Sequence, residues 1–221
     1  MAGPLGVLLA PGAGTDRNHS SLVTLADALT GVGHDVVRMD FPYRKAGKKV
    51  PDKTPVLVQA VRDEANSIST PLVLGGRSMG GRMCSIAVAE GLEAAALILI
   101  CYPLHPPGNP DRLRVEHFPN ITIPCLFVSG TRDAFGTPDE LQSHTTAIAG
   151  PVTHIWIEGA DHSLRKRDGE VAGVVVEWLS GLRTLPATRA TGSHPPAPGP
   201  PSPGSAPRST ARRSAGRSRP T

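Results

Sequence analysis

LVLGGRSMGG, residues 72–81, is the stretch of sequence that most strongly constrains the fold. It opens on three apolar residues that predict a strand, and a run of small residues at 83–90 then predicts a helix. Gly76-x-Ser78-x-Gly80 therefore stands at a strand-to-helix turn and matches the nucleophile-elbow pattern. The glycines avoid clashes with neighbouring elements, and the strained turn holds the Ser78 hydroxyl clear of the sheet. A phosphate loop would end on Lys and Ser or Thr, which this stretch lacks; a purely structural turn is the other alternative.

Short apolar runs alternate with helix-period segments over residues 4–183. The runs have the near-continuous hydrophobicity of strands that are buried on both faces. Alternation of strand and helix predicts an α/β fold with right-handed crossovers, a mainly parallel sheet of about six strands and helices on both faces. The runs are Leu5–Ala10, Val36–Met39, Leu72–Leu74, Ala95–Cys101, Cys125–Val128 and His154–Ile157.

Two Thr-Pro pairs predict helix starts between these strands. Thr54 is followed by proline, which suits an N-cap and the first helical position. Thr137 is also followed by proline, and with Glu140 it forms the pattern of a capping box. The last helix is expected over residues 171–182, where apolar residues make a broad stripe.

The chain of 221 residues has a formal net charge of +4, which is distributed unevenly. Six arginines and no acidic residue follow Leu185, so the rest of the chain carries a net charge of −2. Residues 186–221 are also rich in proline and poor in large apolar residues, and such a segment cannot bury enough surface to fold. We therefore expect one folded domain over 1–185 and a disordered tail over 186–221. The tail is either a solvated appendage or an arm for nucleic acid, but no aromatic residue accompanies its arginines.

Hydropathy argues against an integral membrane protein. The longest apolar run, Ala94–Tyr102, has nine residues, whereas a membrane-spanning helix needs about 20. No basic region precedes the first apolar run, so we read it as a strand and expect a cytoplasmic protein with reduced thiols. Cys84 is expected on a helix and Cys101 and Cys125 on strands, each as a buried, inert residue.

A serine nucleophile needs a base, and the base needs a group that orients it. Asp133 follows one expected strand, and His162 follows the next. The chain order Ser78, Asp133, His162 is that of the serine hydrolases with a nucleophile elbow. All three residues fall beyond the carboxyl ends of strands, where open α/β sheets place their sites. Asp161 is a rival acid, but we expect it in a solvated loop because it is adjacent to the histidine.

Two backbone amides are candidates for an oxyanion hole. Met79 follows the nucleophile and opens a helix, whose N-terminus favours developing negative charge. The second donor is expected in the loop after the first strand, at Ala13, with Gly12 as the alternative. A plain Gly/Pro turn is the structural interpretation of this loop.

Several other polar residues are less informative. His19 is expected to cap a helix or lie at the surface. Arg77, inside the elbow, either binds an anionic substrate group or, more in keeping with its position, pairs with a local acid. Arg114, Glu116 and His117 lack the spacing of metal ligands and are expected at the surface.

Together these signals resemble the α/β-hydrolase family over residues 4 to about 183. The triad of that family would map onto Ser78, Asp133 and His162. The sequence starts at the equivalent of the family's third strand, which implies that the antiparallel entry strands are missing. Only residues 102–122 stand where many relatives insert a cap domain, which implies no helical lid and an open site.

A finer resemblance links the chain to a branch of small dienelactone-hydrolase-like proteins. It rests on residues 102–107, with support from residues 10–14, 130–133 and 136–138. The branch includes the testis-expressed hydrolase-like protein and a non-catalytic subunit of a chromatin acetyltransferase complex. True dienelactone hydrolases use a cysteine nucleophile, whereas this elbow holds serine.

The segment Tyr102–Asn109 is expected to overhang the nucleophile. Tyr102 and His105 would then contact substrate. The alternative for Tyr102 is a packing role at the end of a strand, and the alternative for His105 is a polar residue in a loop.

The prediction from sequence is therefore a serine hydrolase that acts on a small carboxylic ester or thioester and needs neither cofactor nor metal. The alternative is a catalytically silent scaffold for protein interaction, because fold does not determine function. The expected partner is the small-molecule substrate, with nucleic acid reached only through the tail if at all. The sequence leaves the oligomeric state open.

Overall fold

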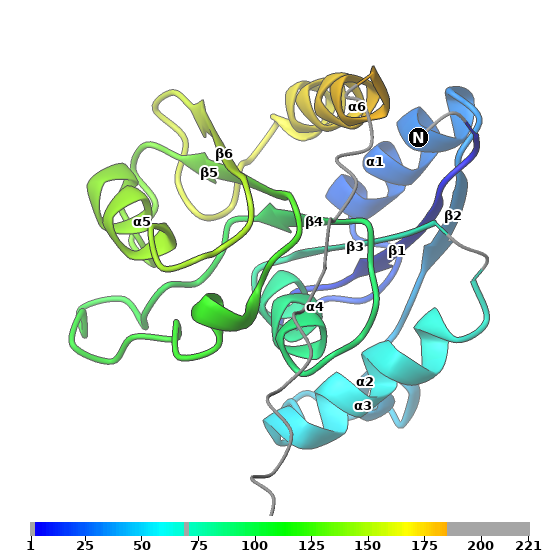
Figure 1. The fold of residues 1–221 in the computed structure, drawn as a ribbon. Coiled ribbons are helices and arrows are strands. Elements are labelled where there is room, and N and C mark those ends of the chain that lie inside the picture. The colour runs from blue at the N-terminus through cyan, green and yellow to red at the C-terminus, as the bar shows by residue number, and fades with distance from the viewer. Residues whose placement is uncertain (1–2, 69–70, 185–221) are drawn as a thin grey trace, which may run out of the picture. The chain divides into compact units, whose positions relative to one another are not determined.

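The computed structural model describes residues 3–68 and 71–184; the predicted tail, 186–221, lies outside these ranges. Six strands form one sheet in the described part of the chain, in the order β2-β1-β3-β4-β5-β6, and every neighbouring pair is parallel (Figure 1). The strands are β1 (Gly6–Ala10), β2 (Asp35–Arg38), β3 (Leu72–Arg77), β4 (Ala96–Ile100), β5 (Cys125–Gly130) and β6 (Val152–Ile157). The predicted α/β fold with about six mainly parallel strands is confirmed.

Helices cover both faces of the sheet (Figure 1). One face packs against α1 (Ser20–Gly31) and α6 (Asp168–Thr184). The other face packs against α2 (Pro42–Lys45), α3 (Thr54–Ala65), α4 (Met79–Ala89) and α5 (Pro138–Thr145). A parallel sheet needs this double cover because each of its crossovers places a helix on one face.

The central strands explain the continuous hydrophobicity of the apolar runs. Successive side chains of a strand point to opposite faces, so Leu8 and Leu74 join one hydrophobic layer while Val7 and Val73 join the other. All five residues of β1 and of β4 are buried. Both faces must therefore be apolar, and the sheet is held between two cores.

The strand order creates a crevice at the carboxyl edge of the sheet. The chain leaves β1 toward β2 on one side, and β3 then pairs with β1 on the other side. In open α/β sheets such a reversal separates the loops that follow the two strands, and ligands bind between them. The loop after β1 and the elbow after β3 thus flank one site.

Some element boundaries differ from those predicted. Strand β3 continues to Arg77 and helix α4 begins at Met79, so Ser78 alone joins them. The capping box of Thr137 with Glu140 is confirmed, whereas Thr54 is the first residue of α3 and Lys53 is its N-cap. Cys101 lies just beyond β4 with a φ of 48°, rather than within a strand.

The connection between β4 and β5 contains only the 3-10 helix η1 (Phe118–Asn120) and irregular backbone. No α-helix forms there, so this fully described connection builds no cap domain, as predicted. Among the helices of residues 3–68 and 71–184, none has the length and hydropathy to cross a membrane.

Candidate active site

The turn at Ser78 is as tight as the glycine pattern predicts. Ser78 has a φ of 51° and a ψ of −117°, a backbone conformation that residues other than glycine rarely adopt. A Cβ on Gly76 would lie 2.6 Å from the Gly81 nitrogen, and one on Gly80 would lie 2.2 Å from the Ala10 carbonyl oxygen. Both positions therefore exclude any larger residue, and close packing of β1, β3 and α4 maintains the backbone strain at Ser78.

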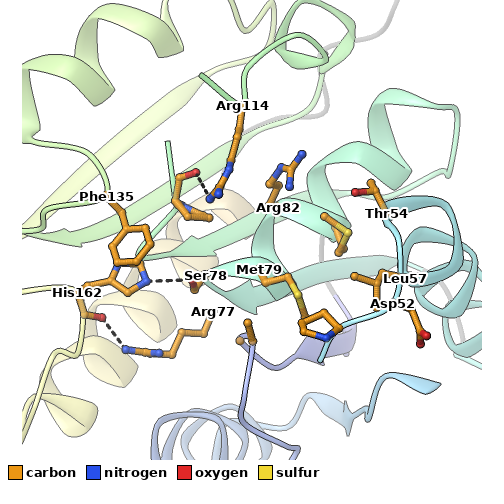
Figure 2. A pocket seen from close by; sticks show the side chains of 15 residues that line it. Asp52, Thr54, Leu57, Arg77, Ser78, Met79, Arg82, Arg114, Phe135 and His162 are labelled. Atoms are coloured by element: carbon orange, nitrogen blue, oxygen red, sulfur yellow. Dashed lines mark hydrogen bonds between the residues drawn. The ribbon is translucent and has the colours of Figure 1, made fainter. Parts of the chain in front are cut away.

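Side chains from three strand ends meet in one hydrogen-bonded row at this turn. The Ser78 hydroxyl oxygen lies 2.9 Å from Nε2 of His162. On the other side of the ring, Nδ1 of His162 lies 2.8 Å from Oδ2 and 3.0 Å from Oδ1 of Asp133. Figure 2 shows the His162 ring directed at Ser78. The residues predicted for the triad, which lie 84 and 29 positions apart along the chain, are thus in direct contact.

The acid and the imidazole are held by their surroundings. Asp133 is 1% exposed, and its Oδ1 accepts a hydrogen bond of 2.9 Å from the backbone N–H of Phe135. The Phe135 ring stacks on the ring of His162 with centroids 3.9 Å apart. Nη2 of Arg77 donates to the His162 carbonyl oxygen at 2.6 Å, so the predicted pairing of this arginine with an acid is wrong. These contacts restrict the rotation of the imidazole.

Asp161, the rival acid, is exposed and turned toward its own loop. Its carboxylate accepts hydrogen bonds from the backbone N–H and the hydroxyl of Ser163, and these bonds lower its pKa. His19 is likewise occupied, since its ring accepts from the Ser21 backbone N–H as the N-cap of α1. Neither side chain takes part in the hydrogen-bonded row.

Gly12, Ala13 and Met79, the predicted oxyanion residues, line a cavity of about 440 Å³ beside Ser78. A Cβ on Gly12 would lie 3.6 Å from the Cβ of Ser78, so the loop after β1 packs against the elbow. Met79 is the first residue of α4, whose N-terminal amides have no partner within the helix. Two backbone segments thus border the cavity next to Ser78.

The predicted contact of Tyr102 and His105 with substrate is not supported. Tyr102 is 1% exposed and packs edge-on against Phe127, and its hydroxyl donates to the Arg114 carbonyl oxygen at 2.6 Å. His105 is 5% exposed and lies 3.4 Å from the Glu140 carboxylate. Neither residue lines the cavity; of this segment, Pro103 borders it, while the side chains of Tyr102 and His105 are buried.

Several residues of the cavity wall were missed as site residues from sequence. Arg114 was expected at the surface, but it lines the cavity, as do Arg82, Asp52 and Phe135 (Figure 2). Arg82 had a usable signal: it lies four residues after Ser78 on the following helix, which puts both on the same side. Arg114 and Asp52 come from irregular segments whose course no local pattern predicts.

His117 was also expected at the surface, but it is half-buried. Its Nε2 lies 2.8 Å from the Ser85 hydroxyl, and its ring packs edge-on against Phe118. Burial, reinforced by the charge of Arg82, lowers the pKa of His117 to about 4.

Within the described residues, one group has the composition and spacing of a metal site: Cys101, Asp133 and His162, whose ligand atoms lie within 4.8 Å of one another. Two of these residues already form the hydrogen-bonded row. Burial raises the pKa of the Cys101 thiol to about 12. The carboxylate of Asp133 and Nδ1 of His162 bond to each other, so we assign these two residues to the hydrogen-bonded row rather than to a metal.

Comparison with known proteins identifies the family. A family model described as "Alpha/beta hydrolase domain" matches residues 4–175, and the chain belongs to this family. Epoxide hydrolase A from Mycobacterium tuberculosis is 38% identical over 63 residues, a match that spans 28% of this chain and 20% of that protein. The shared segment is a small part of that relative.

Solved structures resemble the whole folded region. Est1E from Butyrivibrio proteoclasticus, in a structure with bound ferulic acid, has a TM-score of 0.71 at 16% identity and covers 83% of this chain and 91% of its own. An alpha-beta serine hydrolase homologue from Coxiella burnetii has a TM-score of 0.66 at 21% identity and covers 79% of this chain and 85% of its own. At such identities these structures establish the fold alone, and the dienelactone-hydrolase-like branch stays a prediction.

Proposed function

We propose that this α/β hydrolase is a serine hydrolase that cleaves a small carboxylic ester or thioester through an acyl-enzyme. The observation that carries the proposal is the unbroken row from the Ser78 hydroxyl through His162 to Asp133, with contacts of 2.9 and 2.8 Å. A nucleophile, a base in reach of it and an acid that orients the base are the parts that acyl transfer requires.

The contacts of the imidazole define its role. With its proton on Nδ1, His162 donates to the buried carboxylate of Asp133 and presents the Nε2 lone pair to Ser78. The Ser78 oxygen attacks the substrate carbonyl carbon while Nε2 takes the hydroxyl proton. The imidazolium, stabilised by Asp133, then protonates the leaving alcohol or thiol, and the acyl group stays on Ser78. Water attacks the acyl-enzyme with His162 again as base, and the acid is released.

The negative charge of the tetrahedral intermediate is assigned to backbone amides. We assign this role to the N–H groups of Met79 and Ala13, because both residues line the cavity beside Ser78 and the loop at Gly12 packs against the elbow. Each donor of this kind typically contributes about 3–4 kcal/mol to transition-state stabilisation. The N-terminus of α4 adds a favourable dipole. The proposed steps use only side chains, amides and water.

Labelling with a fluorophosphonate probe tests the proposal directly. The Ser78 oxygen should displace fluoride and form a phosphonyl adduct, which mass spectrometry of the peptide detects. Ser78→Ala should abolish the adduct, whereas Ser163→Ala, which removes an exposed serine hydroxyl beside His162, should leave it intact. A folded wild-type protein that stays unlabelled would favour the silent scaffold instead.

We also propose that residues 1–185 suffice for hydrolysis. Every residue of the proposed site lies between Gly12 and His162. A chain that ends at residue 185 should hydrolyse p-nitrophenyl esters as the full chain does. A large loss of activity on truncation, with the fold intact by circular dichroism, would show that the tail contributes.

A further inference from the structure

The cavity beside Ser78 contains a charged feature that the proposed acyl transfer does not use. Arg82 lies one helical turn beyond Ser78 on α4, and its backbone N–H donates to the Ser78 carbonyl oxygen at 3.1 Å. Figure 2 places Arg82 on the side of Ser78 opposite to His162. The Nε of Arg82 is shielded from solvent and has no hydrogen-bond partner among the described residues. This arginine is thus directed at the cavity without a partner of its own.

Arg114 reaches the same part of the cavity from the β4–β5 connection. Its Nη1 makes one long contact of 3.4 Å with the Pro103 carbonyl oxygen, which Figure 2 marks with a dashed line. The Tyr102 hydroxyl donates to the Arg114 carbonyl oxygen at 2.6 Å and anchors the backbone at this point. Tyr102 is therefore a positioning residue for Arg114. Partial burial and the nearby charge of Arg82 both lower the pKa of Arg114.

This arrangement is unfavourable unless an anion completes it. Two guanidinium groups of like charge interact at the wall of a partly enclosed cavity, and a shielded N–H without a partner is costly. Asp52 supplies the only carboxylate among the cavity-lining residues, and in the described part of the chain no carboxylate lies within 4.0 Å of either arginine. Other arginines form ion pairs; for example, Nη2 of Arg62 lies 3.2 Å from Oε2 of Glu90.

We infer that this enzyme takes substrates that carry a carboxylate or phosphate group beside the scissile carbonyl, and that Arg82 and Arg114 bind this anion. The inference rests on the proposed function for the position of the carbonyl at Ser78. The planar guanidinium presents paired N–H donors that match the oxygens of both anions. Because Arg82 lies one turn from the nucleophile, the anion and the reacting carbonyl belong to one small molecule.

Selectivity between matched esters tests the inference. The mono-p-nitrophenyl ester of glutaric acid carries a carboxylate, and its methyl ester has the same chain without the charge. We expect kcat/KM of the wild-type protein to be higher for the anionic ester. The ratio of the two values should fall about tenfold or more in Arg82→Gln and in Arg114→Gln, chiefly through KM for the anionic ester.

Arg112→Gln is the matched control, because it removes the same charge from an exposed position two residues before Arg114. It should leave the ratio of kcat/KM values unchanged. Equal kcat/KM for the two esters, or the same ratio in the variants as in the wild type, would overturn the inference while the hydrolysis itself upholds the proposed function.

A binding measurement separates this inference from catalysis. Ser78→Ala should be titrated separately with glutarate, inorganic phosphate and neutral glutaramide, with binding measured by calorimetry. One or both anions should bind, and the diamide should not. Addition of Arg82→Gln to Ser78→Ala should weaken that binding about tenfold or more. The anion that binds more tightly identifies the charged group that the substrate carries. Anion binding without any ester turnover would overturn the proposed function alone, whereas no anion binding would overturn the inference.

Discussion

The two sides of the cavity differ in how completely their polar groups are satisfied. On the catalytic side, His162 bonds to Ser78 and to Asp133, and its carbonyl accepts from Arg77. On the arginine side, the Nε of Arg82 has no partner among the described residues, and Arg114 makes one long side-chain contact. The row of Ser78, His162 and Asp133 is complete without a ligand, whereas the guanidinium groups of Arg82 and Arg114 are not. The Nε of Arg77, which also borders the cavity, likewise has no partner among the described residues.

This difference matches the two proposed roles, catalysis on one side and ligand binding on the other. A catalytic group must hold its geometry before the substrate arrives, because reorganisation during the reaction raises the barrier. A binding group must keep its donors free for a ligand, at a cost to the stability of the empty protein. The contrast therefore predicts that changes on the catalytic side affect turnover most, and that changes on the arginine side affect affinity and selectivity.

Removal of the nucleophile should have the largest effect. Ser78→Ala should lower kcat for p-nitrophenyl esters by about 10⁴-fold or more, because no other hydroxyl lies in the row. The melting temperature should change little, since alanine keeps the Cβ. Activity near the wild-type level in Ser78→Ala would show that another group attacks the ester.

Loss of Asp133, the acid that is proposed to orient His162, should have the second largest effect on turnover. Asp133→Asn should reduce kcat by about 10³- to 10⁴-fold, because an amide favours the imidazole tautomer that cannot accept the Ser78 proton. Asp161→Asn is the matched control: this exposed acid is adjacent to His162, and its loss should change kcat less than about twofold. Equal losses in the two variants, measured with the same ester, would contradict the assignment of Asp133.

A third change tests how rigidly the catalytic side is built. In Gly80→Ala, the new Cβ would approach the Ala10 carbonyl oxygen to 2.2 Å, so the free energy of unfolding should fall by about 3 kcal/mol. Gly173→Ala, in α6, meets no atom within 4 Å and should raise it by up to about 1 kcal/mol. Urea denaturation measures both changes, and similar values for the two variants would mean that the elbow is not tightly packed.

The smallest predicted effect concerns His117, whose pKa is lowered by burial and by the charge of Arg82. Its pKa of about 4 in the folded protein is below the ordinary value of 6.5, so the unfolded chain takes up a proton first as the pH falls. The stabilising contribution of the neutral ring is therefore present above pH 6.5 and is lost as the pH falls toward 4. Between pH 7 and pH 5 the wild type should lose about 1–2 kcal/mol more stability than His117→Gln.

Chemical denaturation at the two pH values measures this difference. If His117→Gln shows the same pH dependence as the wild type, burial of this ring does not contribute to the acid sensitivity of the folded protein.

Most of the fold was predictable from local patterns. Continuous apolar runs mark strands that are covered on both faces, and the capping box at Thr137 marks the start of α5. The residues proposed for catalysis were also found from sequence, because parallel strands place the residues that follow them along one edge. Boundaries were less certain where two elements join at a single residue, as at Ser78.

Predictions about irregular segments were less successful. Tyr102 and His105 were expected to touch substrate, yet the connection after β4 buries both of them and directs Arg114 into the cavity instead. Nothing in the amino-acid sequence of this segment distinguishes a buried tyrosine from a tyrosine at the mouth of an active site. The difference depends on the turn at Cys101 and on packing against Phe118 and Phe127.

The sequence by itself determined the parallel sheet, the glycine-bounded turn at Ser78 and the edge at which Asp133 and His162 would lie. These features depend on backbone sterics and on the period of apolar residues, which act over a few neighbouring positions. Only the tertiary structure decided that Arg82 and Arg114 face one cavity, with no acidic partner among residues 3–68 and 71–184. That outcome depends on how segments far apart in the chain pack together, and no local pattern encodes such packing.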